Sequence, residues 1–334
     1  MEKAHDSERK DIRSIWTQMI QKMGNHDIHD FLRTMWVSRH GDLKKDDLFT
    51  ALKNHIETKN ISAIDFAREC GDECDDYFYL AIADESQLPK DSFQYVRAIT
   101  RELGLRPALP LLLSSYLSLN EADFADVARF ILVFVVRYSI IGNRDSSGME
   151  DLLFRLAREV RTMAVPARDK TVSLQAKGHV KATLASHAPD DNATKMSVLD
   201  ADPDPSDAKY VMTRLARYIQ DPEKQVTLGE TNLEHIYPQN PEANAWGGPA
   251  NQEKLEPLTW NLGNLTIFGK RANRKAANDE FDKKRIRYAQ SKILMTQQLP
   301  NDDTVWDEAA IKTRAKVLAK LVIHVWNFNN PSQV

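Results

Sequence analysis

The first 165 residues of the chain repeat apolar side chains at the spacing of amphipathic helices. In the first such segment the apolar positions fall on one helical face: Ile12, Ile15, Trp16, Met19, Ile20 and Met23. The same pattern covers the ranges 28–37, 43–56, 61–83, 93–103, 108–119, 124–141 and 149–163. Short breaks separate these segments, as in helices that pack antiparallel. The pattern predicts an N-terminal multi-helix domain.

The pattern changes in the second half of the chain. Residues 188–207 are acidic and contain prolines, a composition that favours an exposed connection. Residues 208–220 and 306–326 each predict a helix, whereas 265–268 is a short apolar run that predicts a strand. The predicted organisation is an α-helical domain at 1–187, a linker at 188–207 and a second, mainly helical domain at 208–334.

Composition limits the classes of protein to which the chain can belong. A chain of 334 residues with 42% hydrophobic residues can build the cores of two or three domains. The net charge of −3 gives no global attraction for nucleic acid, so any such binding must rely on a local basic patch. The longest apolar run, 130–136, is far shorter than the roughly 20 residues of a membrane span.

The cysteines and the N-terminus both favour a reducing compartment. Cys70 and Cys74 lie four residues apart, but no further Cys or His follows at the spacing of a zinc site. We therefore interpret them as small buried residues. The N-terminus has no signal-peptide pattern, and we expect a cytoplasmic protein with no membrane partner.

Three short segments carry the strongest chemical signal: Thr-Asn-Leu-Glu-His-Ile-Tyr-Pro-Gln-Asn-Pro at 231–241, Gly-Asn-Leu-Thr-Ile-Phe at 263–268 and Lys-Arg-Ala-Asn-Arg-Lys at 270–275. Hydrolysis of a phosphodiester needs a base for the attacking water and a cation for the phosphate charge. His235 can be that base, since imidazole titrates at about pH 6.5. The segments therefore indicate a metal-dependent nuclease site.

The residues beside His235 suit a hard metal ion. Glu234 supplies a carboxylate, and Asn273, in a helix expected to begin near Lys270, supplies an amide oxygen; both are ligands that Mg²⁺ accepts. Neighbouring side chains of a strand point to opposite faces, so Glu234 and His235 can share one metal only if the strand ends or bends there. Pro238 favours such an end.

At these residues the chain resembles the HNH, or ββα-metal, nucleases. The resemblance implies that Glu234 is a metal ligand, His235 the general base, Asn264 the residue that holds the loop of the base, and Asn273 the second ligand. It implies Mg²⁺ as the cofactor, with Mn²⁺ as a substitute. The expected fold is thus a multi-helix domain followed by a helical domain that carries a small ββα-metal nuclease core at 208–334.

A narrower group fits better, because its members share the Leu-Glu-His-Ile-x-Pro-Gln-Asn segment, a later Trp, here Trp246 or Trp260, and Gly-Asn-Leu-Thr. This group is the C-terminal domain of GmrSD-type modification-dependent restriction enzymes, with the SspE-like, phosphorothioation-linked restriction factors among its relatives. The resemblance implies double-stranded DNA, including modified DNA, as substrate in anti-phage defence. It also implies a nucleotide-dependent N-terminal domain or subunit that the sequence lacks.

The stretch 270–292 holds nine basic residues against three acidic ones. A solvated helix face is the ordinary explanation, but directly after the motif we expect Lys270, Arg271, Arg274 and Lys275 to bind DNA phosphates. A single site of this kind cuts one strand per engagement, so the predicted activity is that of a nickase. The alternatives are a regulatory DNA-binding or partner-docking module that is inactive alone, and, less favoured, RNA cleavage.

Overall fold

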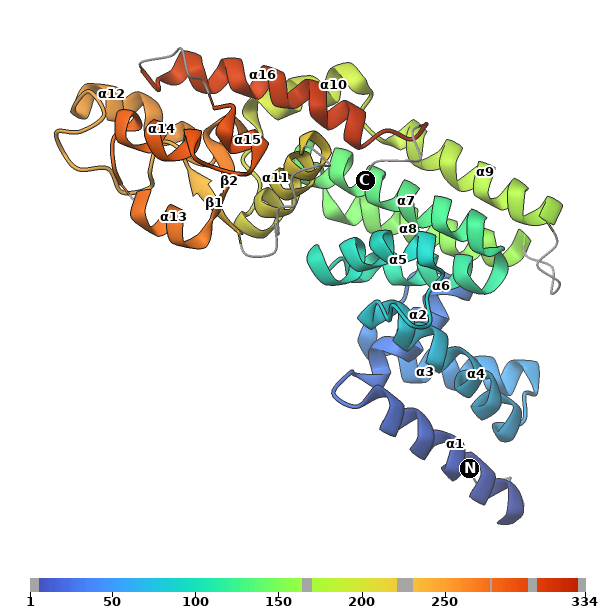
Figure 1. The fold of residues 1–334 in the computed structure, drawn as a ribbon. Helices are drawn as coiled ribbons and strands as arrows, with labels where there is room; N and C mark the ends of the chain where they lie inside the picture. The colour runs from blue at the N-terminus through green and yellow to red at the C-terminus, as the bar shows by residue number, and fades with distance from the viewer. Residues whose placement is uncertain (1–5, 164–169, 221–230, 277, 300–304, 330–334) are drawn as a thin grey trace. The chain divides into compact units, whose positions relative to one another are not determined.

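The computed structural model describes residues 6–163, 170–220, 231–276, 278–299 and 305–329 (Figure 1). Its described part is mainly helical with two short strands, as the sequence predicts. The chain forms two compact units, one from 1–132 and 145–184, the other from 133–144 and 185–334. It passes from one unit to the other within α7 (Glu121–Val135), between residues 144 and 145, and within α9 (Lys170–His187).

The first unit is all helical in its described residues. Besides parts of α7 and α9 it contains α1 (Asp6–Met23), α2 (Ile28–His40), α3 (Leu48–Lys59), α4 (Ala63–Ile82), α5 (Lys90–Arg97), α6 (Leu109–Ser118), α8 (Ser146–Met163) and the short turns η1 (Lys45–Asp47), η2 (Ala98–Glu102) and η3 (Arg106–Ala108). α1 packs on α4, and α6 packs on α8. Every helical segment predicted for the first half of the chain has a counterpart among the described helices, with the end of 124–141 lying in the second unit, so the prediction of a mainly helical chain is confirmed.

The second unit contains both strands. Its elements are η4 (Val136–Ile141), α10 (Asp191–Asp200), α11 (Pro205–Ile219), β1 (Thr231–His235), α12 (Pro249–Leu255), η6 (Glu256–Leu258), η7 (Leu262–Asn264), β2 (Leu265–Gly269), α13 (Lys270–Ala276), α14 (Phe281–Ala289), α15 (Leu294–Gln297) and α16 (Glu308–Val325). α11 packs against both strands, and α10 packs against α16 (Figure 1). The predicted helices at 208–220 and 306–326 correspond to α11 and α16.

The segment expected to be an exposed linker, 188–207, instead contains a packed helix. Asp190 caps α10 by accepting a hydrogen bond from Ala193 N at 2.7 Å, and Pro205 occupies the first turn of α11. Thr194 and Val198 are fully buried. The acidic and proline residues that suggested a linker are the start signals of two helices, because Asp suits the N-cap and Pro the first turn.

None of the described helices has the length and apolar character needed to cross a membrane. The cores of both units are instead filled by side chains from several elements. In the second unit one such cluster includes Ile236, Tyr237, Trp246, Phe268, Phe281, Tyr288 and Trp306. This cluster surrounds the end of β1, and it therefore fixes the position of the motif residues.

Candidate functional site

Two antiparallel strands and the helix that follows them carry the motif residues. β1 pairs with β2 so that Glu234 lies opposite Thr266 and His235 lies opposite Leu265. β1 ends at His235, and α13 begins at Lys270, directly after β2. The strand predicted at 265–268 and the helix predicted to begin near Lys270 are therefore both present.

The imidazole of His235 is held in one tautomer. Its Nδ1 lies 2.9 Å from the carbonyl oxygen of Thr259, and since a carbonyl only accepts, Nδ1 carries the proton. Nε2 is then an acceptor, and Gln239 Nε2 donates to it at 3.0 Å. The ring of Trp260 meets the imidazole edge to face, with centroids 4.4 Å apart. Burial lowers the pKa of His235, which favours the neutral ring that a general base requires.

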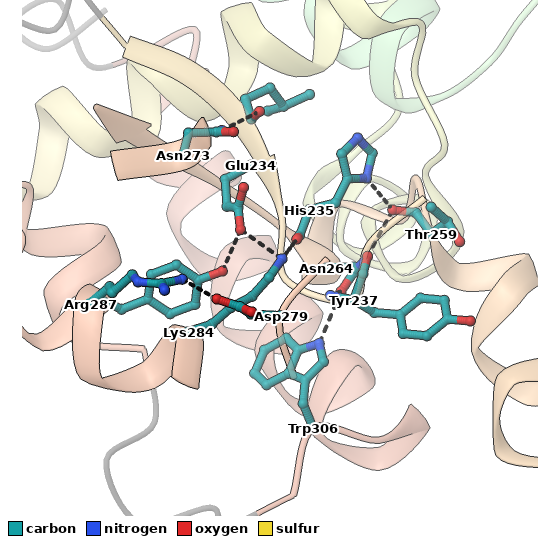
Figure 2. Close-up of polar contacts among 12 residues, drawn as sticks. Glu234, His235, Tyr237, Thr259, Asn264, Asn273, Asp279, Lys284, Arg287 and Trp306 are labelled. Atoms are coloured by element: carbon teal, nitrogen blue, oxygen red, sulfur yellow. Dashed lines mark hydrogen bonds and ion pairs between the residues drawn. The ribbon is translucent and has the colours of Figure 1, made fainter. Parts of the chain in front are cut away.

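Asn264 holds the loop that follows His235, and its side chain is fully buried. Oδ1 accepts from Tyr237 N at 2.8 Å and from Trp306 Nε1 at 2.9 Å. Nδ2 donates to the carbonyl oxygens of Tyr237 and Thr259, both at 2.9 Å (Figure 2). The Thr259 oxygen that receives Asn264 is the same atom that fixes His235. Asn264 therefore positions His235 through the two backbone segments around it.

The turn that presents Asn264 requires glycine at the preceding position. A Cβ atom on Gly263 would lie 2.3 Å from the carbonyl oxygen of Ile311 in α16. Asn261 Oδ1 accepts from Gly263 N at 2.8 Å, which closes the turn. Arg314 Nη1 donates to the carbonyl oxygens of Gly263 and Leu265 at 2.8 and 2.6 Å. The turn therefore lies directly against α16, and only glycine fits there.

Glu234 is directed to the interior, away from the ring of His235 (Figure 2). Its Oε1 accepts from Lys284 Nζ at 2.9 Å and from Tyr288 Oη at 2.6 Å. Lys284 also donates to the carbonyl oxygen of His235 at 2.7 Å. Burial raises the pKa of Glu234 and lowers that of Lys284, and the attraction between the two groups opposes both shifts.

Asn273 connects α13 to β1. Its Nδ2 donates to the carbonyl oxygen of Leu233 at 3.0 Å, in the peptide that precedes Glu234. This orientation leaves Oδ1 of Asn273 as the amide oxygen available to a ligand. The structure thus brings the carboxylate residue and the helix asparagine to the same place on β1.

The donor set at this place suits a magnesium ion. Among the described residues no three His, Cys, Asp or Glu side chains gather where they could hold a metal. Both hydrogen bonds that the described residues make to Glu234 use Oε1, so Oε2 of Glu234 and Oδ1 of Asn273 are the hard oxygen atoms that could act as ligands. Mg²⁺ keeps several waters and takes its remaining ligands from one or two carboxylates and from substrate phosphates. One carboxylate and one amide are compatible with such an ion.

The basic side chains near the site divide into two groups. Lys270, Arg271 and Arg274 of α13 are exposed, as phosphate contacts would require, whereas the side chain of Lys275 lies outside the described residues. The basic surface expected across 270–292 is smaller than the sequence suggests. Lys284 is buried against Glu234, and Arg287 is paired with Asp279.

Several residues of this site carry no signal in the sequence. The indole that reaches Asn264 is Trp306, whereas Trp246 and Trp260 were the expected family tryptophan. Trp306 precedes α16 and lies 42 residues from Asn264, so the sequence gives no sign of their contact. Lys284 and Tyr288 show only the helical spacing that places them, with Phe281, on the buried face of α14.

Residues 189–321 match the family model described as GmrSD restriction endonucleases, C-terminal domain. The match includes every residue of the site and confirms the resemblance that the motif indicated. It covers the second unit from shortly before α10 into α16. No curated protein matches the chain. The family relation indicates a role related to that of restriction endonucleases.

Proposed function

We propose that the chain is a metal-dependent DNA endonuclease of the HNH type, with His235 as its general base. The observation that carries this proposal is the state of the imidazole: Thr259 holds Nδ1 protonated, so the lone pair of Nε2 is directed to Gln239 at the protein surface. A base in this state can remove a proton from a water that attacks phosphorus.

The surrounding residues then have defined tasks. The carbonyl oxygen of Thr259 stabilises the imidazolium that forms when Nε2 takes the proton. Asn264 holds Thr259 and Tyr237, so the ring does not need to reorient during the reaction. Trp260 contacts the imidazole ring edge to face and helps to hold its orientation. Such preorganisation is a large part of catalysis in phosphoryl transfer.

Glu234 and Asn273 are proposed to hold Mg²⁺, or Mn²⁺ in its place. A bound divalent cation would supply a Lewis acid that neutralises charge on the scissile phosphate. The carboxylate Oε2 and the amide Oδ1 are the protein oxygens that we assign to it. Asn273 is joined to the backbone of β1, so a cation held by Asn273 would lie beside the strand that ends in His235.

DNA is proposed to contact the exposed basic side chains of α13. Lys270, Arg271 and Arg274 are exposed next to the motif, and with Lys275 they would bind backbone phosphates. Contacts to phosphates position a duplex without reading its sequence, so we expect little base preference. One site breaks one strand, and the default product is therefore a nick.

The family match supports a role in a restriction system, and we propose that this system acts against phage. In that setting the substrate would be double-stranded DNA, including modified DNA, and a nucleotide-dependent partner domain or subunit would control cutting. The alternative is that the chain is a regulatory DNA-binding or partner-docking module and does not cut DNA by itself.

Conversion of supercoiled plasmid to the open-circular form tests the proposal. We expect conversion by the wild-type chain with Mg²⁺ or Mn²⁺, and none with EDTA. The variant His235→Ala should be inactive, whereas His324→Ala, which changes an exposed histidine of α16, should cut like the wild type. A folded wild-type chain that binds plasmid with Mg²⁺ but leaves it supercoiled would refute the nuclease proposal for this chain alone and favour the regulatory module.

A further inference from the structure

A buried lysine lies at the candidate metal site. The side chain of Lys284 is 0% exposed, and that of its partner Glu234 is 5% exposed. The ammonium group donates to Glu234 Oε1 at 2.9 Å and to the carbonyl oxygen of His235 at 2.7 Å. Lys284 therefore contacts both residues of the acid-histidine pair, from a helix 50 residues further along the chain.

Stability alone does not account for a lysine at this position. Lys284 lies on the inner face of α14 between Phe281 and Tyr288, both buried. Lysine is almost never fully buried unless it is paired, and replacing a buried ion pair with apolar residues of similar volume is often neutral or stabilising. An apolar pair could pack against the same neighbours, and the only hydrogen bond it would remove outside the pair among the described residues is the one from Lys284 to the carbonyl oxygen of His235. The charge of Lys284 therefore requires a functional explanation.

We propose that Lys284 offsets the charge of Glu234, so that the site binds a divalent cation tightly only when a DNA phosphate contributes the missing negative charge. This inference rests on the proposed function, because it assigns a regulation to the same site. The cation would then enter the site together with the substrate.

The argument follows from the charges of the groups around the site. Glu234 contributes one negative charge and Lys284 one positive charge, while Asn273 and the neutral ring of His235 contribute none. Asp279 and Arg287 also act on this pair, but they are ion-paired with each other and their charges cancel. The affinity of an oxygen site for a divalent cation depends on its ligand charge. A site whose protein charges sum to zero binds such a cation weakly, and a phosphate oxygen supplies both a ligand and a charge.

The position of the ammonium supports this role over a purely structural one. Tyr288 donates to the same Oε1 at 2.6 Å, so the carboxylate is oriented even without Lys284. Both donors use one oxygen and leave Oε2 for a ligand. Lys284 adds to the contact made by Tyr288 a positive charge at Glu234 and a hydrogen bond to the carbonyl oxygen of His235.

Binding of Mn²⁺, followed by the electron paramagnetic resonance signal of the free ion, tests the proposal. The parent protein carries His235→Ala, so that DNA is not cut, and is titrated with and without a duplex oligonucleotide; the Mn²⁺ bound by the duplex alone is subtracted. Lys284→Met removes the charge at nearly equal volume. Lys283→Met, which removes an exposed lysine of the same helix, is the matched control. Circular dichroism establishes that each protein is folded.

We expect the parent to bind Mn²⁺ at least ten-fold more tightly with DNA than without it. Lys284→Met should bind Mn²⁺ at least ten-fold more tightly than the parent when DNA is absent, and Lys283→Met should differ from the parent less than three-fold. A folded Lys284→Met variant that binds no more tightly than the parent would overturn the proposal. If Lys284→Met does not fold, equal affinities of the parent with and without DNA would overturn it.

The titrations can contradict the role of Lys284 without contradicting the nuclease proposal, and the reverse also holds. If the wild-type protein nicks plasmid but Mn²⁺ binding does not depend on DNA, the proposed role of Lys284 is wrong and the nuclease proposal stands. If Mn²⁺ binding depends on DNA and responds to Lys284→Met but the wild type does not nick plasmid, the charge effect stands and the nuclease proposal is wrong.

Discussion

The indole nitrogen of Trp306 donates a hydrogen bond to Oδ1 of Asn264 at 2.9 Å. Trp306 is 2% exposed and Asn264 is fully buried, so neither atom can exchange this bond for one to water. Asn264 in turn binds the Thr259 carbonyl that fixes His235. The segment that leads into α16 is therefore part of the support of the proposed base.

Replacement of Trp306 by Phe should lower both stability and activity. The comparison is Trp326→Phe, because Trp326 is equally buried but its Nε1 has no hydrogen-bond partner among the described residues. Both variants lose the same volume, and only Trp306→Phe loses a hydrogen bond. We expect Trp306→Phe to reduce the free energy of unfolding by about 1 kcal/mol more than Trp326→Phe, as measured by urea denaturation. Equal losses would show that the indole bond contributes nothing.

Replacement of Asn264 by Asp should be more damaging, although the two side chains have nearly the same shape. The second carboxylate oxygen would face the carbonyl oxygens of Tyr237 and Thr259, which now receive Nδ2. The carbonyl oxygen of Thr259 would keep its bond to His235, but that of Tyr237 would be left unpaired next to a charge, which costs on the order of 3 kcal/mol or more. Asn244→Asp, at an exposed position of the same unit, is the control and should alter the urea midpoint little. A stable, active Asn264→Asp variant would refute the assigned hydrogen bonds.

A methyl group at position 263 should be poorly tolerated. The Cβ of Ala would approach Ile311 O to 2.3 Å, which forces the turn away from α16. Overpacking of this kind costs about 1–3 kcal/mol. Gly269→Ala in β2 is the control, because no atom lies within 4 Å of the added Cβ, and its effect should stay within about 0.5 kcal/mol. The thermal unfolding midpoints of the two variants are compared, and we expect Gly263→Ala to have the lower midpoint.

The sequence predicts the local parts of this fold and site well. β2 and α13 follow from an apolar run ending at Gly269 and from the helical residues after it, and the structure has both. The periodicity of the first half likewise predicts its helices, because each buries one face. α10 was missed because Asp and Pro are common to helix starts and to loops.

The contacts between distant segments could not be predicted in this way. Lys284 belongs to a stretch whose composition predicts a basic surface. The burial of Lys284 is explained only by its pairing with Glu234 of β1. Trp306 and Arg314 approach the Gly263 turn because α16 packs there. No local pattern records these pairings, since each depends on how elements far apart in sequence are packed.

The two cysteines should be unreactive in the folded chain. Cys70 is fully buried and Cys74 is 1% exposed, both on α4. Burial raises the pKa of Cys70 to about 12 and that of Cys74 to about 11. The thiolate is the reactive form, so at pH 8 we expect little reaction with Ellman's reagent in native buffer. Both thiols should react promptly in guanidinium chloride, and fast labelling of the native protein would contradict their placement.

The rate of nicking should depend on pH through His235. The base must be neutral to accept a proton, and burial lowers its pKa below the ordinary value of 6.5. The neutral fraction rises with pH, and because the folded-state pKa is lowered, this fraction is larger at any given pH than that of an imidazole in water. We therefore expect the single-turnover rate, at fixed Mg²⁺ and saturating plasmid, to rise from pH 5 to a plateau whose midpoint lies below 6.5. DNA binding is measured over the same pH range, so that a change in rate caused by titration of His235 can be distinguished from one caused by weaker DNA binding. A midpoint above 7 would show that the charged form of His235 is favoured, and would exclude the proposed state of the base.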